Sequence, residues 1–160
     1  MAYILDTNIL IRSKNEMPIE LWPSFWSKLC QMMADGHVLS NISVRDEINR
    51  GKDELTLWIV QNAPKGFFVE NDNEVMAKYV EVLNWANGNS TFTELAIAEF
   101  AQIADAYLIA TAAAKGYVLV TNETSDPLCR RRVKIPDACN ALGVRYCDLN
   151  QVLRELGITI

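Results

Sequence analysis

Apolar and polar positions alternate along the chain in blocks that predict short strands and longer helices in turn. The chain opens on a short apolar run, Ala2–Leu5, which predicts a first buried strand and ends in a carboxylate, Asp6. The other segments predicted to be extended are, in chain order, His37–Ser40, Phe67–Val69, Tyr117–Val120 and Arg145–Cys147.

Between these runs, apolar residues recur at the spacing of one helix face. The predicted helices are about Trp22–Ala34, a segment that starts at Ser43 and carries Glu47, Glu54–Asn62, Asn73–Ala86, Thr93–Lys115, Asp137–Leu142 and Leu149–Leu156. The stretch Thr93–Lys115 is either one long helix or two helices with a joint near Ala104 and Asp105.

This alternation predicts one three-layer α/β/α domain over residues 1–160, with a mostly parallel sheet of four to five strands. A chain of 160 residues is long enough for one hydrophobic core and too short for two ordinary domains. The sequence has no internal repeat and no linker between domains.

Composition and charge narrow the classes of function. No uncharged apolar run approaches the ~18 residues of a membrane span, and the N-terminus lacks the basic region of a secretory signal. The four cysteines form no C-x-x-C pair, so we expect reduced thiols in a cytoplasmic protein. The net charge of −5 disfavours binding of nucleic acid by bulk electrostatics, so any such binding must be local or bridged by a metal.

Four acids recur near the ends of predicted elements, namely Asp6, Glu47, Asp105 and Glu123. Open α/β sheets bind their ligands at the carboxyl ends of the strands, and that is where Asp6 and Glu123 fall. Asp105 lies among alanines and leucines, where a carboxylate is costly unless it is paired or bound to a metal.

Each acid also has an ordinary interpretation. Asp6 suits the N-cap of a following helix, and Asp105 suits the N-cap at a joint between two helices. Glu47 has polar neighbours typical of a solvated helix, and Glu123 suits a loop or a cap. Their recurrence along one rim of the predicted sheet favours a shared site instead.

Clustered carboxylates are the ligands that Mg²⁺ and Mn²⁺ prefer. Such an ion polarises a phosphoryl oxygen and lowers the pKa of an attacking water, which is the chemistry of phosphodiester hydrolysis. Without a metal, the mutual repulsion of the acids raises the pKa of at least one of them.

The order of these acidic segments resembles a known family, the PIN domain. The segments that carry the resemblance are Leu5–Asn8, Ser43–Ile48, Ala104–Ala110 and Leu119–Glu123. The family comprises metal-dependent ribonucleases and is best known as the toxins of toxin–antitoxin pairs. Lys134–Cys139 together with Trp22–Trp26 is similar to an uncharacterised PIN-like subgroup, and the resemblance runs from Ala2 to about Leu156.

The resemblance implies roles for individual residues. Asp6 matches the first metal-binding Asp, and Asn8 matches the polar residue that supports it. Glu47 matches the acid on the helix after the second strand, and Asp105 matches the Asp on the helix that leads into the Tyr117–Val120 strand.

Thr121 and Glu123 match the Thr and the final acid, which in the family is usually Asp. The implied metal ligands are therefore Asp6, Asp105 and Glu123. Because Glu123 is longer than Asp by one methylene, Asp126 is a candidate substitute. The resemblance also implies Mg²⁺ or Mn²⁺ as cofactor, RNA as substrate, an antitoxin as partner and a homodimer.

A basic run, Arg130–Arg132 with Lys134, follows the last acid by a short loop. It is either an ordinary solvated surface or an edge of the site that grips RNA phosphates, for which Arg is well suited.

The leading hypothesis is a metal-dependent endoribonuclease of the PIN type, the toxin of a toxin–antitoxin pair. The alternative is a non-catalytic PIN-like module that binds RNA or a protein. A third possibility, a phosphohydrolase of the haloacid dehalogenase type, needs a second acid two residues after the first, where this chain has Asn8.

Overall fold

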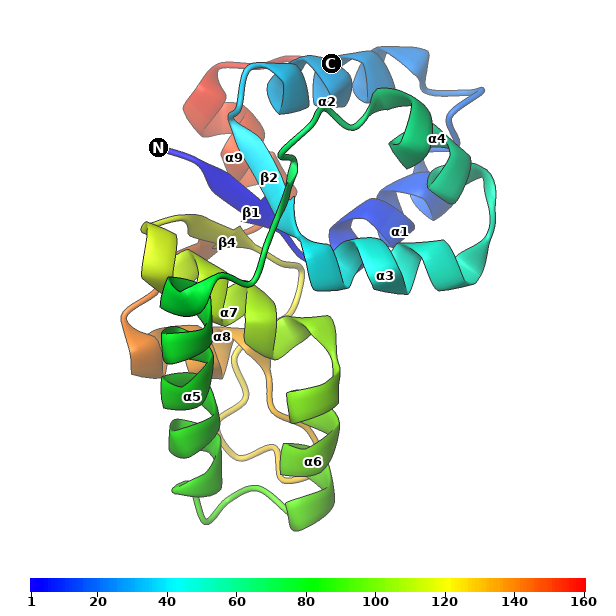
Figure 1. The fold of residues 1–160 in the computed structure, drawn as a ribbon. Helices are drawn as coiled ribbons and strands as arrows, with labels where there is room; N and C mark the ends of the chain where they lie inside the picture. Colours follow the sequence, from blue (N-terminus) through cyan, green and yellow to red (C-terminus); the bar gives the residue numbers. More distant parts are fainter.

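A five-stranded parallel sheet organises the chain in the computed structural model, which describes all 160 residues (Figure 1). The strands are β1 (Tyr3–Leu5), β2 (Val38–Asn41), β3 (Phe68–Val69), β4 (Val118–Val120) and β5 (Tyr146–Cys147), in the spatial order β3-β2-β1-β4-β5. Ile4 of β1 pairs with Leu39 on one side and with Leu119 on the other. The residues of β1 and β4 are all buried, as expected for parallel strands covered on both faces.

Helices cover both faces of this sheet. They are α1 (Thr7–Glu16), α2 (Pro23–Ala34), α3 (Ile42–Gly51), α4 (Glu54–Asn62), α5 (Asn73–Asn87), α6 (Glu94–Gln102), α7 (Ala104–Lys115), α8 (Ile135–Leu142) and α9 (Leu149–Leu156). Figure 1 shows α1, α2 and α9 on one side of the sheet, with α5, α7 and α8 on the other. One hydrophobic cluster of 36 buried residues joins the layers. The predicted three-layer α/β/α architecture is confirmed, and the sheet is wholly parallel.

The strand order reverses direction between β1 and β4. The chain builds the sheet outward from β1 through β2 to β3, and then returns to place β4 on the other side of β1. Such a switch point leaves a crevice at the carboxyl ends of the two strands, because their connections leave in opposite directions. Asp6 directly follows β1 and Thr121 directly follows β4, so both lie at this point.

Helix α7 brings a third segment to the same place. It packs on β1, β2 and β4 from within the core, and its N-terminus points toward the switch point. The stretch Thr93–Lys115 is two helices, α6 and α7, which meet at Ile103 with a bend of 68°. This bend places Asp105 in the first turn of a helix rather than in the middle of one.

Three helices differ from the pattern-based prediction. Helix α1 was not predicted, because its apolar residues Ile9–Ile11 look like a continuation of the first strand. Helix α3 begins at Ile42, since the side chain of Asn41 caps it by accepting from the Ser43 N–H (2.8 Å). Helix α8 begins two residues earlier than predicted, with Pro136 in its first turn, where the missing N–H of proline costs no hydrogen bond.

No single helix of the chain is both long enough and apolar enough to cross a membrane. Taken together, α6 and α7 meet the length and composition criteria, but only as the bent pair described above.

Candidate functional site

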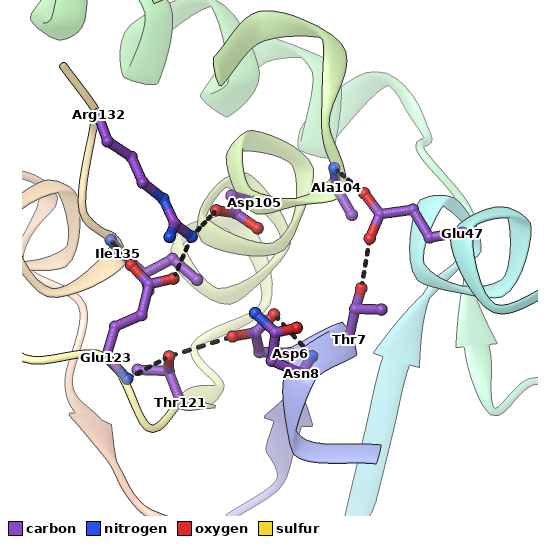
Figure 2. A network of polar contacts seen from close by, with 10 residues as sticks. All are labelled: Asp6, Thr7, Asn8, Glu47, Ala104, Asp105, Thr121, Glu123, Arg132 and Ile135. Carbon is purple, nitrogen blue, oxygen red and sulfur yellow. Dashed lines mark hydrogen bonds and ion pairs between the residues drawn. The ribbon is translucent and has the colours of Figure 1, made fainter. Parts of the chain in front are cut away.

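Asp6 lies at the switch point, directly after β1 and beside the end of β4. The residue is 1 % exposed. One carboxylate oxygen accepts from the hydroxyl of Thr121 at the end of β4 (3.1 Å), and the other accepts from the Asn8 N–H (3.4 Å; Figure 2). Asp6 is thus the N-cap of α1. It also belongs to the acidic group, by which we mean Asp6, Glu47, Asp105 and Glu123, so the two interpretations of Asp6 are compatible.

Asp105 faces Asp6 from the first turn of α7 (Figure 2). It is 7 % exposed, and its Oδ2 atom is buried without any hydrogen-bond partner. The nearest cation is Arg132, whose Nη2 lies 3.8 Å from that oxygen, too far for a hydrogen bond. Asp105 is not the N-cap of α7, a position taken by Ile103 without a side-chain bond.

Glu123 reaches the group from the segment after β4. Its Oε2 accepts from Arg132 Nη2 (2.9 Å), and its Oε1 accepts from the N–H of Ile135 (3.2 Å), the first residue of α8. Its own N–H donates to Thr121 Oγ1 (3.1 Å). Glu123 therefore caps α8 from a distance, and Thr121 links it to Asp6.

Glu47 approaches from α3 and holds two other elements in place. Its Oε1 accepts from the N–H of Ala104 (2.9 Å), and its Oε2 accepts from the hydroxyl of Thr7 (2.8 Å; Figure 2). It is not a solvated helix residue, since both oxygens have protein partners. Because α7 lacks an N-cap side chain of its own, Glu47 supplies the acceptor that its first turn needs.

Burial and like charge disturb the ionisation of the two aspartates. Burial, followed by the negative charge of Glu123, raises the pKa of Asp6 to about 6. Burial, followed by the charges of Asp6 and Glu123, raises the pKa of Asp105 to about 8, against a smaller lowering by Arg132. The two aspartates are therefore affected by the charges of the other acids, and burial does not favour the charged forms of Asp6 and Asp105.

The chemistry of these residues suits a divalent cation, but their side chains are not arranged around a common point that could hold one. Carboxylate oxygens are the donors that hard cations prefer, and the unpartnered Oδ2 of Asp105 is a buried acceptor that lacks a ligand. No three of the His, Cys, Asp and Glu side chains are arranged to hold a metal ion as they stand. The positive charge beside Glu123 comes instead from the guanidinium of Arg132.

The remaining predicted residues differ in whether they contact the acidic group. Asn8 is exposed and supports Asp6 through its backbone N–H rather than its side chain. Asp126 is exposed and its N–H donates to Asp137 (3.0 Å), so the structure does not join it to the acids. Arg130 and Arg131 form no ion pair, whereas Arg132 enters the site.

The hydroxyl of Thr7 was missed as a site residue. Its position directly after Asp6, at the start of a helix, was the only signal in the sequence. The entry of Arg132 alone among three consecutive arginines had no signal in the sequence, since the run looks uniform.

Taken together, the all-parallel sheet, the switch point and the acids around it define a three-layer α/β/α fold of the PIN-like type. The same fold occurs in a chain of the crystal structure of VapBC2 from Rickettsia felis bound to a DNA fragment from their promoter. The two chains align with a TM-score of 0.58 and 14 % identity over 92 % of this chain and 98 % of that chain.

At the level of sequence, the chain belongs to the family described as a domain of unknown function, DUF4411, whose model matches residues 3–160. No curated protein matches the sequence.

Proposed function

We propose that this protein is a metal-dependent endoribonuclease that uses Mg²⁺ or Mn²⁺ at the Asp6, Asp105 and Glu123 group. The observation that carries the proposal is the buried Oδ2 of Asp105, which has no hydrogen-bond partner and faces two further acids. Leaving a buried acceptor unsatisfied costs about 1–3 kcal/mol, and more for a charged group, unless a ligand repays it. A hard cation is the ligand whose chemistry fits these oxygens.

A divalent ion bound there supplies Lewis-acid polarisation of the phosphate and a more acidic water. The chain's own residues prepare the site for it. Thr121 fixes the carboxylate of Asp6 by donating to one oxygen, and Glu47 fixes the first turn of α7 and hence the position of Asp105. Because the pKa of Asp105 is raised to about 8, binding a cation there releases a proton, and cation affinity increases with pH.

Positive charge beside the acids supports RNA as the substrate. Arg130 and Arg131 lie on the segment that leads to α8, and Lys134 follows them as the N-cap residue of that helix. We propose that these side chains hold RNA phosphates, which suits a protein whose overall charge of −5 otherwise repels nucleic acid.

Two similarities support a proposal for the wider biological role. The acidic segments of the sequence resemble those of PIN toxins, and the fold is similar to that of a chain in the VapBC2 structure. We therefore propose that the protein is the toxin of a toxin–antitoxin pair, acts in the cytoplasm, forms a homodimer and is held inactive by an antitoxin protein.

A second candidate function is a non-catalytic PIN-like module that binds RNA or a protein. It is favoured by one observation, that the acids are not arranged to hold a metal and one of them is already paired with Arg132. The two candidates differ in whether RNA is cut.

The test is cleavage of a labelled single-stranded RNA by the purified protein, with Mn²⁺ or Mg²⁺ and with EDTA. We expect cleavage only with metal, and a loss of more than about 100-fold in Asp6→Asn and Asp105→Asn, since changes to outer-shell residues alone cost roughly 10–100-fold. The control is Asp46→Asn, an exposed acid of α3 paired only with Arg45. Activity that survives EDTA or both variants contradicts the proposal, and RNA binding without cleavage favours the non-catalytic module.

A further inference from the structure

Arg132 is the only basic side chain that forms an ion pair with the acidic group. It lies 2.9 Å from Glu123 Oε2 and 3.8 Å from Asp105 Oδ2, both measured from Nη2. One nitrogen therefore lies between the two carboxylates that would bind a cation (Figure 2). A positive charge in this position lowers the pKa of Asp105, against the burial that raises it.

The two sides of this contact differ in exposure. The side chains of Asp105 and Glu123 are 10 % and 11 % exposed, whereas that of Arg132 is 49 % exposed. The guanidinium is therefore already half in water when it is paired, whereas the two carboxylates depend on a cation that stays beside them. Asp105 projects from the first turn of α7, and Glu123 Oε1 accepts from the N–H of Ile135, so the exposed arginine is the partner most able to move.

The backbone on either side of Arg132 is anchored. The carbonyl of Arg130 accepts from the N–H of Thr93 (3.0 Å), and Val133 is buried at 1 % exposure. Arg132 also lines a hollow of about 190 Å³ beside Phe100 and Ile103 of the α6–α7 joint. Because the backbone is held on both sides, movement of the guanidinium away from the acids has to come from the side chain.

Arg132 is an incomplete partner for the acids. It hydrogen-bonds Glu123 but leaves Asp105 Oδ2 without a hydrogen bond, and it makes no ion pair with Asp6. A divalent cation carries twice the charge and has several coordination positions, so it satisfies more of these oxygens than one guanidinium nitrogen.

We propose that Arg132 is an internal counter-ion that occupies the acidic group in the metal-free protein, competes with the divalent cation for Asp105 and Glu123, and turns to the RNA phosphate when it is displaced. This inference rests on the proposed function, because it assumes that the group binds a cation. It implies that RNA and metal bind with positive cooperativity, since a phosphate that holds the guanidinium removes the competitor of the metal.

The experiment is a Mn²⁺ binding isotherm by calorimetry at fixed pH and ionic strength, without RNA. The proteins are the wild type, Arg132→Gln, Arg132→Lys and the matched control Arg131→Gln. The control removes the same charge from the neighbouring residue, which makes no ion pair. We expect Arg132→Gln to bind Mn²⁺ roughly tenfold more tightly than the wild type, within the usual range of coupling between sites. Arg131→Gln is expected to stay close to the wild type.

Each result decides the matter. Equal or weaker Mn²⁺ binding by Arg132→Gln overturns the inference, as does an equal gain in Arg131→Gln, which would be a general effect of charge. Binding by Arg132→Gln but not by the wild type supports it in its strongest form. If Arg132→Gln does not fold, Arg132→Lys decides. A compact ammonium bridges two carboxylates less well than a guanidinium, so the Arg132→Lys protein should also bind Mn²⁺ more tightly than the wild type. Absence of Mn²⁺ binding in every folded variant overturns the metal proposal itself and this inference with it.

Discussion

Carboxylates near the two ends of β1 have pKa values that are shifted in opposite directions. At the amino end, the hydroxyl of Tyr3 donates to Glu155 of α9, which also accepts from Arg145 and from Gln151 (3.1 Å). These donors, led by Arg145, lower the pKa of Glu155 to about 2. At the carboxyl end, the pKa of Asp6 is raised to about 6 and that of Asp105 to about 8.

The difference lies in burial and in the supply of cations. Glu155 lies at the surface with a complete set of donors, which stabilise its charged form. Asp6 and Asp105 are buried beside two further acids, and the one nearby cation, Arg132, hydrogen-bonds Glu123 and lies 3.8 Å from Asp105 Oδ2. The first carboxylate fastens α9 to the sheet, whereas the second group leaves Asp105 Oδ2 buried without a hydrogen-bond partner.

The largest expected effect concerns the pH dependence of the metal-free protein. The unfolded Asp105 loses its proton near pH 3.8, while the folded one keeps it until about pH 8. The folded state therefore binds more protons over this range, so stability falls as pH rises from about 4 to about 8. We expect the melting temperature in EDTA to fall over this range, and Asp105→Asn to remove much of the fall and to melt higher than the wild type near pH 8.

The control for this prediction is Asp46→Asn, which should keep the wild-type slope. Melting curves by circular dichroism at several pH values make the measurement. If Asp105→Asn has the same slope as the wild type, burial of this acid in the folded protein does not govern its ionisation, and the contrast between the two ends of β1 disappears.

A smaller effect of opposite sign is expected at the amino end. The lowered pKa of Glu155 means that its contribution to stability is complete above about pH 4.5 and is lost as pH falls toward about 2. Glu155→Gln should lower the melting temperature at neutral pH, with a difference from the wild type that shrinks in acid. Glu99→Gln, an exposed acid without an ion pair, is the control. A difference that stays constant down to about pH 2 would show that the charge of Glu155 is not what fastens α9.

The smallest effect is expected at Glu47. It belongs to the acidic group at the carboxyl end of β1, but like Glu155 it has a donor for each of its oxygens. Its two oxygens are satisfied by Ala104 and Thr7, and a glutamine side chain at this position would keep only one acceptor oxygen. We expect Glu47→Gln to reduce the free energy of unfolding by about 1 kcal/mol, comparable to the loss of a helix cap. Urea unfolding at neutral pH measures this, with Asp46→Asn as the control. An unchanged midpoint would show that α7 does not depend on this cap.

Much of the architecture was accessible from the sequence because burial leaves a periodic signal. The short apolar runs located every strand, and the acids after them indicated the rim of the sheet at which they gather, but not the strand order. Helix α1 was missed because Ile9–Ile11 form an unbroken apolar run, in which helix and strand look alike.

Side-chain partnerships were much less accessible. That Glu47 caps α7 depends on how α3 docks against it, a distance of 57 residues along the chain. The choice of Arg132 over Arg131 depends on which way an irregular loop turns, and periodicity carries no information about loops. The residues of the acidic group were predictable, whereas the contacts that balance their charge were not.

The capping of α7 by Glu47 has a consequence for the stage of folding at which the acidic group is assembled. The acidic group is assembled by contacts that are distant in sequence, with sequence separations of 57 for Glu47 and Ala104 and 115 for Asp6 and Thr121. Contacts of long sequence separation form late, because a large loop must close before they stabilise the chain. A chain still emerging from the ribosome therefore carries Asp6 and Glu47 without a site, and the group exists only once β4 has entered the sheet beside β1.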